Sequence, residues 1–261
     1  MNKEIAHVVD LLEQAQDILF ITGAGISADS GLPTYRGVGG LYNDRITEDG
    51  IPIETALAGE TLATRPELTW KYLAQIEKRC RGASFNRAHA VIAEMEKHFR
   101  RVWVLTQNID GLHQQAGAVN VIDIHGNMYH LRCMACDFAT NVEDFSRLEI
   151  PPHCPQCRAI MRPDVVFFGE VLPYEKIALL SDEVAKGFDL YFSIGTTSVF
   201  PYIRAPIEDA MRRGRPSVEI NPGESEFSSI FSLRLALPAA EALGRIWDEY
   251  KRRKTITKDK I

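Results

Sequence analysis

The sequence lacks a long apolar run, an excess of basic charge and a targeting leader. No stretch of about 20 apolar residues is present, which excludes a bilayer-spanning helix. There are 30 Lys and Arg against 35 Asp and Glu, a net charge of -5, and this balance argues against specific nucleic-acid binding. Residues 1–16 carry acidic side chains at amphipathic spacing, which indicates a helix and not a signal peptide. We therefore expect a cytoplasmic protein with no membrane and no nucleic-acid partner.

Internal repeats and low-complexity tracts are also absent, which argues against a repeat architecture. Hydrophobic residues make up 45% and charged residues 25% of the 261 residues, as is usual for a globular enzyme. This length allows one large domain with a small lobe. We expect a monomer whose basic segment 251–261 is a flexible tail.

Short apolar runs recur along the chain, and each ends in small or polar residues. Runs of this length and composition favour buried strands of a parallel sheet, and helical patterns at 88–99 and 203–213 lie between them. The predicted strands cover residues 18–21, 102–105, 121–124, 165–168, 190–194 and 218–220. The pattern predicts an α/β fold, a Rossmann-like parallel sheet with helices on both faces. In such folds ligands bind beyond the carboxyl ends of the strands.

Two stretches interrupt this alternation and predict a second lobe. Residues 37–87 hold a glycine-rich loop and a helical insertion, while residues 128–164 hold four of the five cysteines. The remaining segments form the expected Rossmann-like domain, which comprises residues 1–36, 88–127 and 165–250.

Cysteine is scarce, and four of the five form two Cys-x2-Cys pairs. Cys133 and Cys136 are separated by 17 residues from Cys154 and Cys157, a spacing typical of a structural zinc site. Four thiolates would complete a tetrahedron with no open position for water. Zinc is favoured over redox pairs or disulfides. Cys80 is left over and is expected to be an inert, partly buried thiol.

A glycine-rich turn follows the first predicted strand. Gly23-x-Gly25-x-x-Ala28 fits the dinucleotide fingerprint, although any tight strand-to-helix turn also favours glycine. Gly31 and Pro33 break the helix that a dehydrogenase would continue, and no suitably placed acidic residue follows. A hydride-transfer enzyme is therefore disfavoured.

The segment from Gly23 to Arg36 closely resembles the opening signature of the sirtuin family. The resemblance continues, in the family's order, through residues 106–113, His125-Gly126, the cysteine pairs, residues 168–170, residues 195–198 and Asn221-Pro222. It implies an NAD-dependent protein-lysine deacetylase or deacylase, with NAD as co-substrate, structural Zn²⁺ and acylated lysine side chains of proteins as partners. Such an enzyme transfers the acyl group from lysine to ADP-ribose and releases nicotinamide.

The resemblance also implies the catalytic roles. His125 is the general base that takes a proton from a ribose hydroxyl, while Asn108 orients the ribose and a water molecule. Asp110 holds the nicotinamide carboxamide, and Gln107 contacts the ribose hydroxyls. From the residues alone, a histidine at a strand's carboxyl end favours function, whereas residues 107–110 could equally form a capped strand-to-helix turn.

The remaining expectations concern ligand contacts. Tyr35 stands where most relatives carry Phe, and Ala239 is placed near adenine. The expected cofactor-binding residues are Gly23, Ala24, Gly25, Ser27, Tyr35, Arg36, Gln107, Asn108, Ile109, Asp110, Gly195, Thr196, Ser198, Asn221 and Ala239. The expected peptide-binding residues, which would pair through their main chain, are Val166, Phe168, Gly169 and Glu170.

The preferred acyl group can be inferred from positions where this chain departs from the family pattern. Relatives that remove acidic acyl groups carry a Tyr and, three residues on, an Arg. This chain has Tyr72 followed by Gln75, and Val38 where that branch tends to carry Ala, which favours neutral short acyl groups. Arg79 or Arg81 could take the missing role, and Tyr72 could be an ordinary core residue.

Two other kinds of function stay open from the sequence. NAD glycohydrolysis or ADP-ribosyl transfer would use the same pocket with a different acceptor. A non-catalytic NAD-sensing or zinc-ribbon module would need no base at His125, so the intact set of Asn108, Asp110 and His125 argues against it.

Overall fold

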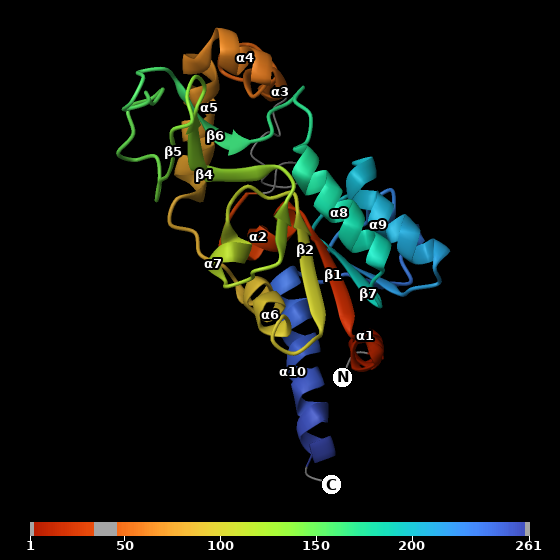
Figure 1. Cartoon of the computed structure of the whole chain (residues 1–261). Helices are drawn as coiled ribbons and strands as arrows, with labels where there is room; N and C mark the ends of the chain where they lie inside the picture. The colour runs from red at the N-terminus through yellow and green to blue at the C-terminus, as the bar shows by residue number, and fades with distance from the viewer. Residues whose placement is uncertain (1–2, 34–45, 259–261) are drawn as a thin grey trace.

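A six-stranded parallel sheet forms the larger part of the molecule, in a computed structural model that describes residues 3–33 and 46–258 (Figure 1). The strand order is β3-β2-β1-β7-β8-β9, and all neighbours are parallel. The strands are β1 Asp17–Thr22, β2 Arg101–Thr106, β3 Val121–Asp123, β7 Leu190–Ile194, β8 Ser217–Ile220 and β9 Leu233–Leu235. The chain order reverses between β1 and β7, and ligands of such sheets bind at this switch point.

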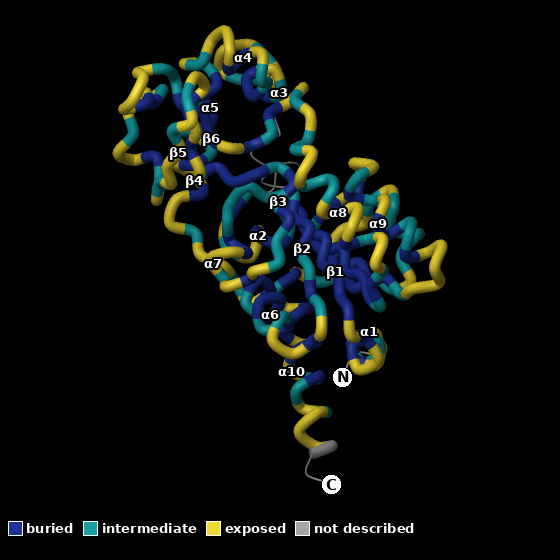
Figure 2. The backbone as a smooth tube through the Cα atoms, viewed as in Figure 1, coloured by how far each residue is buried: buried dark blue, intermediate teal, exposed yellow. Residues whose placement is uncertain are grey.

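Helices cover both faces of this sheet. On one face lie α1 Lys3–Gln14, α6 Arg87–Met95 and α10 Ala239–Lys258, and on the other α8 Tyr174–Lys186 and α9 Pro201–Arg212. Phe20 of β1 belongs to the same buried cluster as Trp247 of α10, whereas Leu19 belongs to the cluster of Ile207 on α9. Successive side chains of a strand point to opposite faces, so β1 contributes to both clusters. Figure 2 shows the sheet as the most continuously buried part of the molecule.

The small lobe combines a second sheet with a group of helices. The antiparallel strands are β4 Gly126–Cys133, β5 Ala139–Asn141 and β6 Met161–Val165, in the order β5-β4-β6. The helices are α3 Ile53–Ala56, α4 Gly59–Thr64 and α5 Pro66–Cys80. Trp70 of α5 is fully buried in the lobe's own cluster, and its indole N–H donates to the carbonyl of Met161 over 2.9 Å. The helices and the zinc-ribbon segment are therefore one packed unit.

Four further helices are each only three or four residues long. They are α2 Ala24–Ser27, η1 Ala28–Ser30, α7 Leu112–Gln115 and η2 Ser228–Ile230. No helix in the described part of the chain is long and apolar enough to cross a membrane.

One predicted strand is wrong, and one observed strand was not predicted. The prediction of a parallel strand at 165–168 is wrong, because Val165 ends the antiparallel strand β6 and Phe167 packs into the lobe's cluster. Within this run Val165 and Phe167 are buried in the lobe's cluster, whereas Phe168 is 38% exposed. Conversely, β9 was not predicted, since its three residues, Leu233–Leu235, include a charged arginine.

The prediction of a flexible tail from residue 251 also differs from the structure. Helix α10 continues to Lys258, and only residues 259–261 lie outside the described chain at this end. The Arg253 guanidinium lies 2.6 Å from the Asp10 carboxylate of α1 and 2.9 Å from Glu249 one turn earlier. The basic residues therefore serve helix pairing, which composition alone does not reveal.

Candidate active site

Three loops meet at the carboxyl ends of β1, β2 and β7. The Gly25 amide donates to the Gly195 carbonyl over 2.9 Å, and the Gly23 amide to Ile194 over 3.0 Å. A Cβ on Gly25 would lie 2.5 Å from the Gly195 Cα, and Gly195 itself has a φ of 59°. These glycines are required by contact between the two loops, independently of any ligand.

Asn108, Asp110 and Ser27 form one polar network over this junction. The Asn108 amide donates to the Gly23 carbonyl over 3.1 Å and to the Ser27 hydroxyl over 3.2 Å. The Ser27 hydroxyl donates to Asp110 over 2.7 Å, and the other Asp110 oxygen accepts the Leu112 amide over 3.0 Å. Burial raises the pKa of Asp110. The turn is thus capped, as one of the two sequence interpretations predicts, and it also faces the junction.

Gln107 links this network to the loop after β7. Its side-chain amide donates to the Thr196 hydroxyl over 2.8 Å, and the Thr196 carbonyl accepts the Asn221 amide over 3.5 Å. Ser198 is buried with a φ of 55°, and its amide donates to the Thr196 hydroxyl over 3.2 Å. The structure therefore brings Gln107, Thr196, Ser198 and Asn221 together as predicted neighbours.

His125 lies just beyond β3, with both ring nitrogens engaged. Nδ1 is 2.9 Å from the Gln107 carbonyl oxygen, and Nε2 is 2.7 Å from the hydroxyl of Tyr202. Burial lowers the pKa of His125; its hydrogen bond to Gln107 opposes this shift, and the Lys176 charge adds to it. The ring is therefore neutral at neutral pH and able to accept a proton.

The four paired cysteines converge in the small lobe. Their sulfur atoms all lie within 4.8 Å of one another, with Cys133–Cys157 at 3.4 Å and Cys136–Cys154 at 3.7 Å. Disulfide sulfurs would be about 2 Å apart, whereas four thiolates about 2.3 Å from one Zn²⁺ lie about 3.8 Å from each other. The cluster is positioned to bind zinc, and all four tetrahedral positions would be taken by protein.

The fifth cysteine is isolated from this cluster. Cys80 is 9% exposed at the end of α5. Burial raises the pKa of Cys80 to about 11, with the charges of Asp110 and Glu77 contributing. Cys80 is thus buried, as expected, and its inertness stays a prediction.

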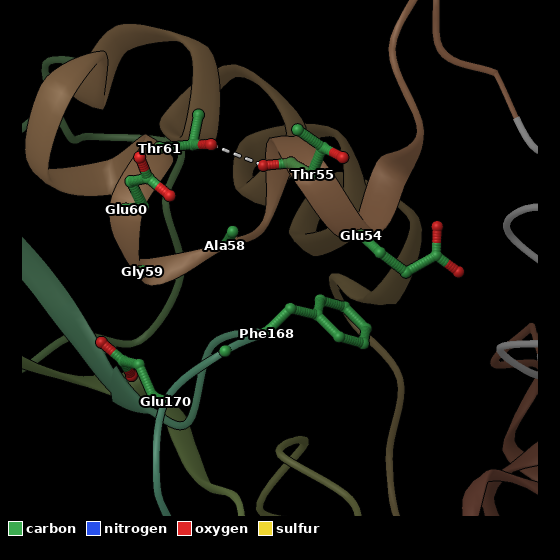
Figure 3. Close-up of a pocket in the computed structure, with 9 residues that line it drawn as sticks. Glu54, Thr55, Ala58, Gly59, Glu60, Thr61, Phe168 and Glu170 are labelled. Atoms are coloured by element: carbon green, nitrogen blue, oxygen red, sulfur yellow. Dashed lines mark hydrogen bonds between the residues drawn. The ribbon is translucent and has the colours of Figure 1, made fainter.

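The predicted peptide segment lies where the two lobes connect. Val166 donates its amide to the His125 carbonyl over 2.9 Å. Phe168 is bonded through both main-chain groups, accepting the Gly59 amide over 3.1 Å and donating to the Leu57 carbonyl over 3.0 Å. Figure 3 shows Phe168 beneath the α3–α4 connection. The depression there is lined by Glu54, Thr55, Ala58, Gly59, Glu60, Thr61, Phe168, Gly169 and Glu170.

Glu170 has a structural role that the sequence did not reveal. Its carboxylate accepts two hydrogen bonds from Arg162, over 2.6 and 2.8 Å, and one from the Phe167 amide over 3.0 Å. Burial alone would raise its pKa, but these bonds and the Arg162 charge outweigh that effect and lower it. Glu170 therefore fixes the 167–170 turn through its side chain.

The two acyl-pocket candidates occupy different environments. Tyr72 is only 3% exposed within the lobe's cluster, and its hydroxyl donates to the Asp49 carboxylate over 2.5 Å. Lys71 lies 2.7 Å from the same carboxylate, while Gln75 is exposed. The core-residue alternative for Tyr72 is thus correct for its ring, and its hydroxyl points to Asp49, which sequence reasoning missed.

The other predicted contacts are distributed unevenly. Ala239 begins α10 and is buried in the large domain's cluster, and Ile109 packs against the lobe's cluster. Tyr35, Arg36 and Val38 lie outside the described residues. Tyr202 was not predicted, because a tyrosine in the first turn of a helix carries no distinguishing pattern.

Comparisons with known proteins bear on this arrangement. Residues 23–201 match the model of the Sir2 family. The NAD-dependent protein deacylase 2 of Pseudomonas aeruginosa is 46% identical over 248 residues, covering 94% of this chain and 96% of that protein. The NAD-dependent protein deacylase 1 of Caldanaerobacter subterraneus subsp. tengcongensis is 38% identical over 231 residues, covering 88% and 92%.

Solved structures agree with the sequence relatives. A Sir2 homologue in complex with NAD has a TM-score of 0.84 at 31% identity, covering 95% of this chain and 94% of that chain. A Sir2 variant with a deacetylated peptide and 3′-O-acetyl-ADP-ribose has a TM-score of 0.83 at 29% identity, covering 94% and 98%. Fold and site together define an α/β protein with a Rossmann-like parallel sheet and a four-cysteine lobe. The chain belongs to the Sir2 family.

Proposed function

We propose that this chain is an NAD-dependent protein-lysine deacylase that transfers the acyl group from lysine to ADP-ribose and releases nicotinamide. The observation that carries the proposal is His125, a neutral histidine beside the junction of the glycine turn, the Gln107–Asp110 turn and the Gly195–Ser198 loop. The relatives named as NAD-dependent protein deacylases and the Sir2 structure with NAD supply the reaction class.

NAD, when bound, supplies an anomeric carbon activated by a good leaving group, nicotinamide. The protein's own contribution is to bind and orient. The turn after β1 and the loop after β7 lie at the strand ends, where folds of this kind bind a pyrophosphate. Asn108 and Asp110 would orient the reacting ribose and the carboxamide, and Asn221 the second ribose. The buried Ser27–Asp110 hydrogen bond holds that carboxyl in place.

His125 would accept the proton of a ribose hydroxyl, which then attacks the acyl carbon. Its Nδ1 must donate to the Gln107 carbonyl, because a carbonyl oxygen has no proton. Nε2 therefore carries the lone pair in the neutral ring. A base with a pKa lowered by burial remains unprotonated at neutral pH, which suits this role.

Acylated lysine side chains of proteins are the proposed partners, held along residues 166–170. The amides of Val166, Phe167 and Phe168 are already bonded within the protein, so a substrate strand would pair with the other main-chain groups of this segment. Such pairing makes little demand on side chains, and broad substrate choice follows. A structural zinc site is consistent with this, since the cysteines leave no position for a substrate.

Neutral short acyl groups are the proposed substrates. Gln75 cannot form the ion pair that an acidic acyl group needs. The Tyr72 hydroxyl is bonded to the Asp49 carboxylate, so a second carboxylate at this hydroxyl would meet like charge. Both observations favour acetyl over succinyl.

The test uses the zinc-loaded full chain with NAD and matched acetyl-lysine, succinyl-lysine or unmodified peptides, followed by mass spectrometry. We expect equal release of nicotinamide and deacetylated peptide, and none with the unmodified peptide. Faster removal of succinyl would contradict the acyl preference alone. Nicotinamide release without deacylation would move the protein to NAD glycohydrolysis, and absence of NAD turnover would contradict an enzymatic function.

A further inference from the structure

The hydroxyl of Tyr202 is hydrogen-bonded to Nε2 of His125, the nitrogen that is expected to act as the base. The hydroxyl oxygen lies 2.7 Å from Nε2, closer than the Gln107 carbonyl oxygen, which lies 2.9 Å from Nδ1. Because Nδ1 donates to the Gln107 carbonyl, Nε2 of the neutral ring is an acceptor, and the Tyr202 hydroxyl must be the donor. Nε2 of His125 is therefore already hydrogen-bonded to the Tyr202 hydroxyl.

The phenol is held in this position by its surroundings. The ring of Tyr202 stacks on Phe200, with centroids 5.5 Å apart and an interplanar angle of 17°. Phe200 in turn meets the His125 ring edge-on at 6.3 Å. Tyr202 lies in the first turn of α9 and packs against the buried cluster of that face of the sheet. Displacing it from His125 would disturb both the stack and this packing.

We propose that Tyr202 relays the proton from the ribose hydroxyl to His125, an inference that rests on the proposed deacylase function. The ribose hydroxyl gives its proton to the Tyr202 oxygen as the phenolic proton passes to Nε2 of His125. The ribose oxygen becomes the nucleophile, Tyr202 ends as it began, and His125 ends as the imidazolium. The phenolic oxygen suits this role because it keeps lone pairs while it donates.

A relay agrees with the electrostatics of the pair. Burial raises the pKa of Tyr202, so the phenol stays protonated and cannot replace His125 as the base. The neutral imidazole is the stronger base of the two at neutral pH and receives the proton. Tyr202 therefore carries the proton without storing it.

The decisive variant is Tyr202→Phe, which keeps the ring and its stacking and removes only the hydroxyl. Nicotinamide release precedes the proton transfer, so exchange of labelled nicotinamide into NAD should stay within about twofold of the parent. Formation of deacetylated peptide should fall by about tenfold to hundredfold, within the range of general acid–base contributions. Tyr174→Phe, which removes a phenol that is 79% exposed on α8, is the matched control and should leave both rates unchanged.

A readout without cofactor tests the hydrogen bond itself. In the free protein, the ¹⁵N resonance of His125 Nε2 should move downfield in Tyr202→Phe, towards an imidazole nitrogen with no donor, while Nδ1 stays unchanged. NAD affinity, measured by calorimetry, should stay within about twofold. These values should be unaltered in Tyr174→Phe.

Three results would overturn the relay. Equal loss of nicotinamide exchange and deacetylation would assign Tyr202 a structural role only. Tighter NAD binding with faster turnover would make its hydroxyl a competitor of the ribose. Unchanged deacetylation would remove it from the reaction. If the parent itself lacks NAD-dependent deacetylation, the proposed function fails instead.

Discussion

The parallel-sheet domain and the small lobe are stabilised by different means. The domain has a buried cluster on each face of its sheet, one formed with helices α1, α6 and α10 and the other with α8 and α9. Most of the buried apolar residues described in the lobe form one cluster, and Cys133 and Cys154 are members of it. A small core gains much of its folding free energy from a metal when one is bound. The comparison teaches that the parallel-sheet domain is built by packing on both faces of its sheet, whereas the core of the small lobe includes two of the four paired cysteines.

The largest expected effect comes from removing the cysteine site. Cys154→Ser should abolish zinc binding and loosen the lobe, because structural zinc contributes about 10 kcal/mol or more in small domains. Hydrogen exchange should rise in β4 and β6 and stay low in β1 and β7. Cys80→Ala, which changes the buried thiol outside the cluster, should retain zinc. If the amides of β4 exchanged as slowly in a zinc-free protein as in the parent, the lobe would not depend on zinc for its stability.

Acid should destabilise the large domain through two buried histidines. The rings of His89 and His113 lie 4.8 Å apart, and burial lowers the pKa of His89 to about 4 and that of His113 well below its usual value. The unfolded chain takes up protons below pH about 6.5, while folded His89 does so only near 4. The free energy of unfolding should therefore fall by about 1.4 kcal/mol per pH unit for each histidine across this window.

This acid dependence is measurable by urea unfolding between pH 7 and pH 4.5. In His89→Gln the slope of the unfolding free energy against pH should be smaller by about 1.4 kcal/mol per pH unit, which corresponds to the uptake of one proton. Identical slopes in variant and parent would show that His89 is protonated equally in both states.

A substitution where the loop of Gly25 contacts the loop of Gly195 should affect the parallel-sheet domain and leave the small lobe unchanged. In Gly25→Ala the new Cβ meets the Gly195 main chain at 2.5 Å, so the two loops must separate. We expect a loss of about 1–3 kcal/mol in stability and weaker NAD binding by calorimetry, with zinc content unchanged. Gly223→Ala is the control, because nothing lies within 4 Å of its Cβ. Parent-like NAD affinity in Gly25→Ala would contradict the tight junction.

The smallest effect is expected at the end of α10. Arg253→Ala removes the ion pairs to Asp10 and Glu249. Because pairs at this level of exposure contribute at most about 1 kcal/mol, the melting temperature should drop only slightly. A large drop in melting temperature would show that the ion pairs at the end of α10 are needed to hold α1 in place. Apolar packing would then contribute less to the stability of this domain than the buried cluster indicates.

Much of the fold was predictable where a run of residues has one environment. The strands at 18–21, 102–105, 190–194 and 218–220 are confirmed, since each is apolar and buried in the parallel sheet. The run at 165–168 has the same composition, but only Val165 belongs to a named strand, the antiparallel β6 of the lobe. Composition reports burial and cannot tell which sheet buries a residue.

The candidate site divides in the same way. The cysteine cluster was predictable because two short motifs fix two sulfurs each, and the structure brings all four together. Tyr72 was ambiguous, since one buried tyrosine resembles another until the Asp49 carboxylate is found beside its hydroxyl. The residue type sets which hydrogen bonds and charges a side chain can offer, whereas its neighbours in the fold determine which of these it uses.

The sequence by itself determined the α/β class, the four-cysteine site, the Sir2 resemblance and the candidate base, because each depends on local pattern and spacing. Tertiary structure alone decided which nitrogen of His125 is the acceptor, that Tyr202 lies on it, and that Glu170 folds its own turn. The partners of His125 lie 18 and 77 residues away along the chain. Hydrogen bonds of such range are set by packing of whole elements, and no local pattern encodes them.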